Sequence, residues 1–590
     1  MDGSAPTQPP PRARLAALIR PMAAQAPGLF DIGALLFIAS TAWGVSQLSA
    51  EWRAPQGSTV EIDLRLSALP LYTFFSLCRG LAAFAASFAF TLLYGYAAAR
   101  VRYADRVLLP LLDVLQSIPV LSFMPGLVLG LAALFPRNNV GLELAAILSI
   151  FTGQVWNMTF SFHASLRSIP AELMEAGRVY RFGWWRRFTR IELPFSTVPL
   201  IWNGMMSMAG GWFFLTINEA FRLGDRDFRL PGVGAYMSVA IDKDDHAAMA
   251  GAVLAMITMI VLLDQLFWRP LVAWAEKFKV QELGGDKAES WLLELLQHSR
   301  INALWRATRK RAKEAARLVA GSEGSATLAE CAPPKAPVLS SGRADLLGLL
   351  LVMVPLALLS VWGTGKLIAL LGQLHAADWL GLFRAAGLTF LRTTVAVVLG
   401  TLWTVPAGIY IGTHPRASRV LQPLVQVAAS FPAPMLFPLV LAVLAKFDIG
   451  LGLGSIALMM LGTQWYILFN VTAGAMGIPA ELKEAATVYR FGRLRLWTRV
   501  LIPGVFPQLV TGWVTAAGGA WNASIVSEYI HAGGEVKVTE GLGATISRAT
   551  ELSQFPLLTA GTLIMAVLVV GINRFFWHRL YALAERKYSL

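Results

Sequence analysis

Charged residues are scarce in this sequence. Only 15% of its 590 residues are Asp, Glu, Lys or Arg, whereas 56% are hydrophobic; a soluble globular protein has about 25% charged residues. This composition excludes a disordered chain and a small disulfide-stabilised domain. The mean hydropathy of +0.56 indicates an integral membrane protein, in which each spanning helix takes about 20 apolar residues.

Cysteine and acidic residues are also few. The two cysteines, Cys78 and Cys331, have no partner at the spacing of a metal site or a disulfide, so neither a metal nor thiol chemistry is expected. Acidic residues number 36 against 50 lysines and arginines, which gives a net charge of +14. In a membrane protein this surplus is explained by basic cytoplasmic loops, so no nucleic-acid partner is expected.

A phosphate-binding loop is missing as well. Such a loop needs the pattern Gly-x-x-x-x-Gly-Lys-Ser/Thr, and only Gly365-Lys366 comes near it. Ser360 stands in place of the first glycine and Leu367 in place of the hydroxyl residue. We therefore expect no ATPase site, and the pattern identifies no catalytic residue.

Long apolar runs fill most of the chain. Their lengths predict about twelve transmembrane helices in an all-α integral membrane protein. The runs span roughly residues 30–50, 69–99, 107–134, 140–166, 195–220 and 247–268 in the first half, and 345–371, 379–411, 421–445, 451–475, 505–527 and 556–577 in the second.

Basic residues predict the orientation. The short loops that follow the second and eighth runs are rich in arginine, and so are segments 178–190 and 490–499. All of these loops fall on one side of the membrane, which is the cytoplasmic side by the positive-inside rule. We therefore expect a multi-pass membrane protein, in contact with lipid and with both termini in the cytoplasm.

Polar segments divide the chain into domains. We expect a cytoplasmic tail over residues 1–28, a first membrane domain over 29–278, a cytoplasmic linker over 279–344 and a second membrane domain over 345–590. Residues 290–318 of the linker have apolar side chains at helical spacing among lysines and arginines. This pattern predicts an amphipathic helix, which lies either on the inner leaflet or against a partner protein.

The two membrane domains repeat one sequence. About 15 of the 25 positions from residue 169 to 193 agree with positions 478 to 502, which is far above a chance echo of composition. Six spans per repeat give both repeats the same topology. We therefore expect tandem repeats related by an axis along the membrane normal, with a pathway between them.

The most similar segment is a polar cytoplasmic loop. Each copy has two glutamates three residues apart, Glu172 and Glu175 in the first repeat and Glu481 and Glu484 in the second. A matched loop indicates function more strongly than a matched core does. The pattern favours a docking helix for a partner over a plain interfacial helix.

This loop resembles the EAA loop of ABC importer permeases. The first repeat has Glu175-Ala176-Gly177 and ends on Leu193-Pro194, and the second has Glu484-Ala485-Ala486 and ends on Ile502-Pro503. The family has a glycine six residues after the glutamate. Here Arg181 and Arg490 take that place, and Gly183 and Gly492 follow two residues later, so a different turn is expected.

The resemblance covers almost the whole chain apart from the tail and linker, and it is strongest to nitrate/sulfonate/taurine-type permeases. It implies two permease domains fused in one chain, which move a small solute, most simply an oxyanion such as nitrate, a sulfonate or bicarbonate. Alternating access would be driven by two separate ATP-binding subunits that carry ATP and Mg²⁺, so no cofactor is expected in this chain. A periplasmic or lipid-anchored solute-binding protein is a further partner that the resemblance allows, and the location that it implies is the bacterial inner (plasma) membrane.

The resemblance also implies which residues couple the chain to the ATP-binding subunits. They are Glu172, Glu175, Ala176, Gly177, Arg181, Gly183, Glu481, Glu484, Ala485, Ala486, Arg490 and Gly492.

Polar residues inside the membrane are candidates for the pathway or its gate, because burying them is costly. Arg79 and Arg392 occupy equivalent positions and would offer positive charge to an anion; the alternatives are snorkelling to the interface or pairing with a carboxylate. Glu219 and Glu528 lie near the ends of their spans, where gating or pairing with those arginines is expected.

Further residues are candidates to line or gate the pathway. Two prolines, Pro119 and Pro432, break or kink equivalent spans, as a hinge or as a static kink. The expected lining residues are Gln154, Trp156, Trp212, Gln464, Trp465, Trp521 and Asn522, although packing is an alternative for the tryptophans.

Two rival classes of protein make different demands on the sequence. A secondary transporter driven by protons or sodium is expected to have a matched carboxylate in the middle of the membrane in both halves, and the sequence shows none there. A membrane enzyme needs a cluster of histidines or carboxylates at one face, whereas the seven histidines are scattered.

Overall fold

The computed structural model describes residues 29–55, 61–101, 104–223, 226–278, 358, 361–532 and 535–588. The N-terminal tail, the linker with its expected amphipathic helix and most of the expected span at 345–371 lie outside these residues. The chain forms two compact units, Met1–Gln47 with Trp291–Ala332 and Leu48–Ser290 with Pro333–Leu590. Nearly all of both membrane domains therefore lies in the second unit.

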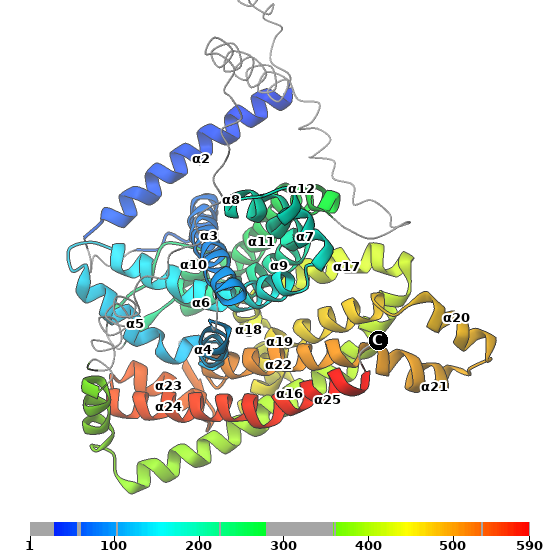
Figure 1. Cartoon of the computed structure of the whole chain (residues 1–590). Helices are drawn as coiled ribbons and strands as arrows, with labels where there is room; N and C mark the ends of the chain where they lie inside the picture. Colours follow the sequence, from blue (N-terminus) through cyan, green and yellow to red (C-terminus); the bar gives the residue numbers. More distant parts are fainter. Residues whose placement is uncertain are drawn as a thin grey trace, which may run out of the picture. The chain divides into compact units, whose positions relative to one another are not determined.

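The described residues are almost entirely helical, which confirms the all-α class (Figure 1). The first repeat consists of α2 (Leu29–Arg53), η1 (Leu66–Ala68), α3 (Leu69–Arg100), α4 (Asp105–Ser117), α5 (Val120–Leu134), α6 (Val140–Arg167), α7 (Ala171–Val179), α8 (Trp184–Arg187), η2 (Phe188–Glu192), α9 (Leu193–Glu219), β1 (Arg222–Leu223), β2 (Arg226–Asp227), α10 (Val233–Asp242), α11 (His246–Leu263), η3 (Asp264–Trp268), α12 (Arg269–Ala275) and η4 (Glu276–Phe278).

After a helix over Val361–Leu371, the second repeat has the same order of long helices, loop helices and hairpin as the first repeat has from α3 on. It consists of α16 (Ala376–Thr413), α17 (Pro415–Ser430), η5 (Ala433–Leu436), α18 (Phe437–Lys446), α19 (Leu451–Met476), α20 (Ala480–Val488), α21 (Arg493–Leu496), η6 (Trp497–Leu501), α22 (Ile502–Ser527), β3 (Tyr529–Ala532), β4 (Glu535–Val538), α23 (Leu542–Glu551), α24 (Phe555–Ile572), η7 (Asn573–Trp577) and α25 (His578–Tyr588). Even the π-helical turns η2 and η3 recur, as η6 and η7, so the duplication extends to local backbone geometry.

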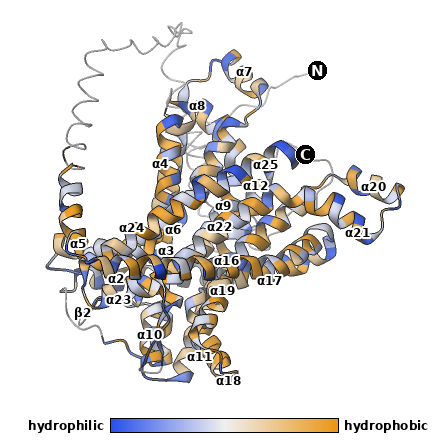
Figure 2. Cartoon of the chain, turned by 90° about the horizontal axis from the view of Figure 1, so that it is seen from below, coloured by the Kyte–Doolittle hydropathy of each residue, from blue (hydrophilic) through white to orange (hydrophobic). Residues whose placement is uncertain are grey.

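Seven of the described helices are long and apolar enough to cross a membrane, or nine if each of two bent pairs is one span. The expected spans at 30–50 and 140–166 are helical too, as α2 and α6, but are not among these nine; α6 carries Gln154 and Asn157. The long helices are mostly hydrophobic, and hydrophilic residues gather at α7, α20 and α21 (Figure 2).

Both proline-containing spans are broken. The axes of α4 and α5 meet at 93° and those of the equivalent pair in the second repeat at 87°. Pro119 and Pro432 sit in the breaks with extended backbone, directly ahead of the second helix. A proline lacks a backbone N–H and disfavours helix at the residue before it, which explains a sharp bend here. Whether the bends act as hinges stays a prediction.

The two repeats interlock. In each repeat three long helices pack side by side, α3, α6 and α9 in the first and α16, α19 and α22 in the second. The last span of each repeat packs against the broken span of the other, α24 against α4 and α5 and α11 against α17. Thr562 on α24 donates to the carbonyl of Ser122 at 3.1 Å, and Asn573 donates to Asp113 at 3.1 Å. The two repeats are therefore in direct contact through their last spans and broken spans.

Two short hairpins are additions to the expected helices. β1 pairs antiparallel with β2, and β3 with β4. Each directly follows the long helix α9 or α22 and precedes a short helix, α10 or α23. The hairpins therefore lie at the end of the bundle opposite to the loops that contain α7 and α20.

Candidate functional site

The loops with α7 and α20 fold alike. Each helix begins after a proline and ends in a turn in which Arg181 (φ 51°) or Arg490 (φ 49°) adopts left-handed backbone. The next residue, Phe182 or Phe491, closes the turn by donating its N–H to a helix carbonyl at 2.9 Å. Figure 1 shows α20 and α21 projecting from the bundle.

The backbone of this turn is unusual for arginine. Arg181 and Arg490 stand in place of the family's glycine and adopt the left-handed conformation, at a cost of about 1–2 kcal/mol for a residue with a Cβ. A turn that differs in shape from that of the family stays a prediction. The glycines two residues later, Gly183 and Gly492, have ordinary φ values of −63° and −64°. They do not take over the turn.

This backbone gives a testable expectation. Arg181→Val places a β-branched residue in a left-handed turn and should lower the free energy of unfolding by about 1–2 kcal/mol. Arg181→Gly should keep or raise the thermal unfolding temperature of the purified protein, since glycine adopts the left-handed turn without the strain that a Cβ brings. The control is Arg178→Val, which lies in α7 and loses only about 0.5 kcal/mol of helix propensity; equal effects of the two valine variants would contradict the turn's role.

The tips of both loops are exposed and apolar. Val179 and Tyr180 are 78% and 74% exposed, and Val488 and Tyr489 are 78% and 76% exposed. Exposed apolar groups gathered at one place mark interaction surfaces. The same surface therefore appears twice on the molecule.

The expected coupling residues surround these tips. Gly177 and Ala486 occupy equivalent positions, and both are buried. A Cβ on Gly177 would lie 2.8 Å from Ile191 Cδ1, so the first loop favours glycine, whereas the second loop has room for alanine. Glu175 and Glu484 are exposed and make no ion pair or hydrogen bond with any residue that the structure describes. The exposed members of the set are Glu172, Glu175, Ala176, Arg181, Gly183, Glu481, Glu484, Arg490 and Gly492, and Ala485 is half-buried.

Arg79 lies at the centre of a buried ion network. Its Nε is 2.6 Å from Glu143, its Nη1 is 2.8 Å from Glu219, and the same Nη1 donates to the carbonyl of Pro231 at 2.7 Å. All three charged side chains are almost fully buried. A buried charge needs such partners, since each ion otherwise costs several kcal/mol to remove from water.

Arg392 repeats the arrangement with one carboxylate fewer. Its Nη1 is 3.1 Å from Glu528 and donates to the carbonyl of Glu540 at 2.5 Å. Its Nε donates to the backbone carbonyl of Gly452, which occupies the position of Glu143. Both arginines therefore pair with carboxylates, as one of the sequence-based alternatives expected. Direct contact of either with a solute stays a prediction.

The carboxylates of Glu219 and Glu528 also hold the short helices in place. Ser76 donates to Glu219 and accepts from the N–H of Val233 at 2.9 Å, and the N–H of Gly234 donates to Glu219 at 2.8 Å. In the second repeat Thr389 donates to Glu528 and accepts from the N–H of Leu542 at 2.8 Å, and the N–H of Ala544 donates to Glu528 at 3.3 Å. Each glutamate therefore joins an arginine, a hydroxyl and the start of α10 or α23.

Two glycines are required by this arrangement. A Cβ on Gly232 would lie 2.3 Å from Cδ of Glu219, and one on Gly541 would lie 2.2 Å from Oε2 of Glu528. The backbone of both is extended, so space rather than strain excludes a side chain.

Gly232→Ala tests the packing around Glu219. The added methyl group must displace a buried, hydrogen-bonded carboxylate, and we expect a loss of about 2–3 kcal/mol in the free energy of unfolding. Gly130→Ala is the control, because a Cβ there meets nothing within 4 Å. Thermal unfolding in detergent compares the two; a Gly232→Ala protein as stable as the control would contradict the assignment.

The other candidate pathway residues are distributed over smaller cavities and the core. Gln154 and Trp212 are buried, and Gln464 accepts a hydrogen bond from Trp403 at 3.0 Å. Trp156, Trp521 and Asn522 line a cavity of about 140 Å³, and Trp465 and Asn522 line one of about 50 Å³. Their role in a pathway stays a prediction.

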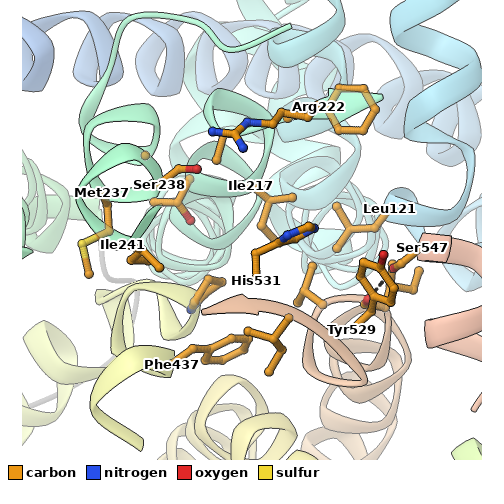
Figure 3. Close-up of a pocket in the computed structure, with 18 of the residues that line it drawn as sticks. Leu121, Ile217, Arg222, Met237, Ser238, Ile241, Phe437, Tyr529, His531 and Ser547 are labelled. Carbon is orange, nitrogen blue, oxygen red and sulfur yellow. Dashed lines mark hydrogen bonds between the residues drawn. The ribbon is translucent and has the colours of Figure 1, made fainter. Parts of the chain in front are cut away.

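A larger cavity of about 400 Å³ lies between the repeats at the end of the bundle that carries the hairpins (Figure 3). Its walls come from the broken spans, from the ends of α9 and α22, and from α10, α23 and β3. Most of the lining is apolar, for example Leu121, Met237 and Phe437. The volume is that of a pocket for a small organic molecule.

The polar groups of this cavity come in equivalent pairs that the sequence analysis missed. Arg222 corresponds to His531, Asp242 to Glu551 and Ser238 to Ser547, each pair 309 positions apart, as are Glu219 and Glu528. Arg222 forms an ion pair with Asp242, and His531 lies 3.6 Å from Glu551. The constant spacing of the repeats was the signal that would have found them.

Tyr529 adds a contact that only the second repeat has. Its hydroxyl donates to Glu551, and the equivalent residue in the first repeat is Ala220. Burial and the hydrogen bond to Glu551 raise the pKa of Tyr529, so the hydroxyl remains a donor at neutral pH.

The fold and these sites define a class of protein: an all-α membrane protein of two tandem repeats with matched peripheral loops and a cavity between the repeats. The family model of the binding-protein-dependent transport system inner membrane component matches residues 91–267 and 404–589. The chain therefore belongs to this family, with one match in each repeat. This confirms the resemblance seen in the sequence.

Individual relatives are similar over parts of their length. The nitrate import permease protein NrtB of Leptolyngbya laminosa is 26% identical over 153 residues, which cover 26% of this chain and 53% of the relative. The taurine transport system permease protein TauC of Escherichia coli is 26% identical over 33% of this chain and 66% of its own length. The putative aliphatic sulfonates transport permease protein SsuC of Bacillus subtilis is 28% identical over 35% and 67%. The chain thus spans about half to two thirds of these relatives.

Proposed function

We propose that this chain is the transmembrane permease of an ATP-driven ABC importer for a small solute of the oxyanion type, with both permease domains in one polypeptide. The observation that carries the proposal is the pair of matched loops. The same turn and the same exposed apolar tip recur at residues 171–183 and 480–492. A pair of such surfaces suits two copies of one partner, or two closely related partners.

The partners that fit these tips are two separate ATP-binding subunits. They would bind and hydrolyse ATP with Mg²⁺, since the sequence of this chain has no phosphate-binding loop. Glu175 and Glu484 would meet basic groups of those subunits, because they are exposed and unpaired among the described residues. The loops lie on the cytoplasmic side in this proposal, with both termini, and the chain is a multi-pass protein of the inner membrane.

Alternating access would follow from the way in which the repeats interlock. Each loop leads through a π-helical turn into the long helix α9 or α22, which ends at Glu219 or next to Glu528. Closure of the ATP-binding subunits would move both helices together. The buried carboxylates would pass this motion to α10 and α23, which line the large cavity.

The solute class rests on the relatives. Their names assign nitrate, taurine, bicarbonate and aliphatic sulfonates to similar permeases. A solute-binding protein at the face with the hairpins is the partner that the name of the family implies.

ATP-driven uptake tests this function. The full chain is reconstituted in proteoliposomes with and without its ATP-binding subunits, and uptake of labelled nitrate, bicarbonate and sulfonates is measured. We expect uptake only when the subunits and ATP are present on the side of the loops. Uptake driven by a proton or sodium gradient without those subunits would contradict the proposal and favour a secondary transporter.

A further inference from the structure

The polar groups of the 400 Å³ cavity are not balanced between the repeats. On the side of the first repeat, Arg222 is paired with Asp242, so the formal charges cancel. On the side of the second, Glu551 faces Tyr529 and His531. With histidine counted as neutral, the side of the second repeat has a formal charge of −1, from Glu551. The formal charges of Arg222, Asp242, His531 and Glu551 together therefore also sum to −1.

The two sides also differ in the hydrogen-bonding groups that remain free to bind a ligand. A guanidinium has five N–H donors, and the bond of Arg222 to Asp242 uses Nη2, so donors remain for an anionic group. Tyr529 occupies one position on the Glu551 carboxylate, which offers about four acceptor sites. Figure 3 shows Arg222 and the Tyr529–His531 strand on different walls of the cavity.

This arrangement disfavours a simple inorganic anion. Such an ion would meet an uncompensated carboxylate and mostly apolar walls, which do not replace its lost hydration. A cation without an acidic group would meet the guanidinium of Arg222. A short molecule with opposite charges at its two ends matches both walls, and its apolar body fits the lining between them.

We propose that this cavity binds a small zwitterion, whose sulfonate or carboxylate contacts Arg222 and whose ammonium contacts Glu551. The inference rests on the proposed transport function and narrows its solute class. Asp242 holds the guanidinium at the cavity wall, and Tyr529 holds the carboxylate of Glu551. Ser238 adds a hydroxyl to the lining, and the hydroxyl of Ser547, which donates to the carbonyl of Ile525 at 2.6 Å, adds an acceptor.

Three probes that share a three-carbon chain test the proposal. They are 3-aminopropanesulfonate, which is a zwitterion, propane-1-sulfonate, which lacks the ammonium, and propylamine, which lacks the sulfonate. Binding of each to the purified complex of the chain with its ATP-binding subunits is measured by titration calorimetry without ATP. We expect 3-aminopropanesulfonate to bind at least about tenfold more tightly than either single-charge probe, since a charge-assisted hydrogen bond contributes about 1.5–3 kcal/mol.

Two variants sharpen the comparison. Glu551→Gln removes the ammonium partner, so 3-aminopropanesulfonate should lose at least about tenfold in affinity while propane-1-sulfonate gains. Asp242→Asn should strengthen propane-1-sulfonate, because the guanidinium loses its competing carboxylate. Both side chains are partly exposed, 38% for Glu551 and 33% for Asp242, so the fold should tolerate the changes.

The outcomes separate this inference from the function on which it rests. Equal or tighter binding of propane-1-sulfonate by the unaltered complex, or an unchanged preference in Glu551→Gln, would overturn the zwitterion site. So would the absence of binding by all three probes. Because the titration needs no ATP turnover, a complex that binds the zwitterion but shows no ATP-driven uptake would contradict the transport proposal and leave the site intact.

Discussion

Replacing both loop tips, Tyr180→Ala with Tyr489→Ala, is expected to abolish ATP-driven uptake while the chain stays folded. The two side chains are 74% and 76% exposed, so their loss removes little packing. In the proposed complex they lie in the contact with the ATP-binding subunits, where an aromatic anchor contributes about 2 kcal/mol or more. Each of the two contacts should therefore lose at least about thirtyfold in affinity.

The measurement has two readouts. Co-purification of the ATP-binding subunits and the uptake rate should both fall, and the thermal unfolding temperature of the isolated chain should not. The control is Leu552→Ala, an exposed apolar residue (54%) directly after α23, at the opposite end of the bundle. If the double variant assembles with the ATP-binding subunits and transports as well as the unaltered chain, the loop tips are not part of the coupling surface.

Arg79→Met is expected to destabilise the chain severely. It leaves Glu143 and Glu219 buried without their counter-ion, and breaking a buried ion pair in this way costs about 3–5 kcal/mol. Arg392→Met should cost less, because it strands only Glu528 and its side chain is already 12% exposed. A larger loss of stability in Arg79→Met than in Arg392→Met indicates that the arginines stabilise the fold through ion pairs. Two equivalent solute contacts would not produce this difference in stability.

A compensating variant makes the prediction sharper. Arg79→Met combined with Glu143→Gln and Glu219→Gln removes the stranded charges and should recover part of the lost thermal stability. The free energies of unfolding are compared for the single and triple variants in detergent. Equal stability of Arg79→Met and Arg392→Met, together with a selective loss of uptake in both, would instead support a direct role in solute binding.

The duplication made most of the fold predictable. Matched segments gave the repeats, their order of elements and the two loops, and prolines at equivalent positions marked the broken spans. The hairpins were not predicted, since strands of two to four residues leave no periodic signal. The left-handed backbone of Arg181 and Arg490 was not predicted, because an arginine gives no sign of it in the sequence.

The candidate site was predictable in part. Arg79, Arg392, Glu219 and Glu528 stood out because charges within apolar runs are rare. In the second repeat the backbone carbonyl of Gly452 takes the place of the Glu143 carboxylate as a partner of the arginine, Arg392. A contact with a backbone carbonyl cannot be predicted from the type of residue at that position. Arg222 and His531 were missed because they lie in polar segments between spans, where a charged residue is ordinary until the cavity shows what surrounds it.

The central claim is that one chain supplies both halves of the permease and engages two ATP-binding subunits through two equivalent loops. Native mass spectrometry of the complex, purified from membranes through a tag on this chain, measures that stoichiometry directly. The account predicts one copy of the 64.1 kDa chain with two ATP-binding subunits. A complex with two copies of this chain for two such subunits, or a chain that is never isolated with any, would contradict it.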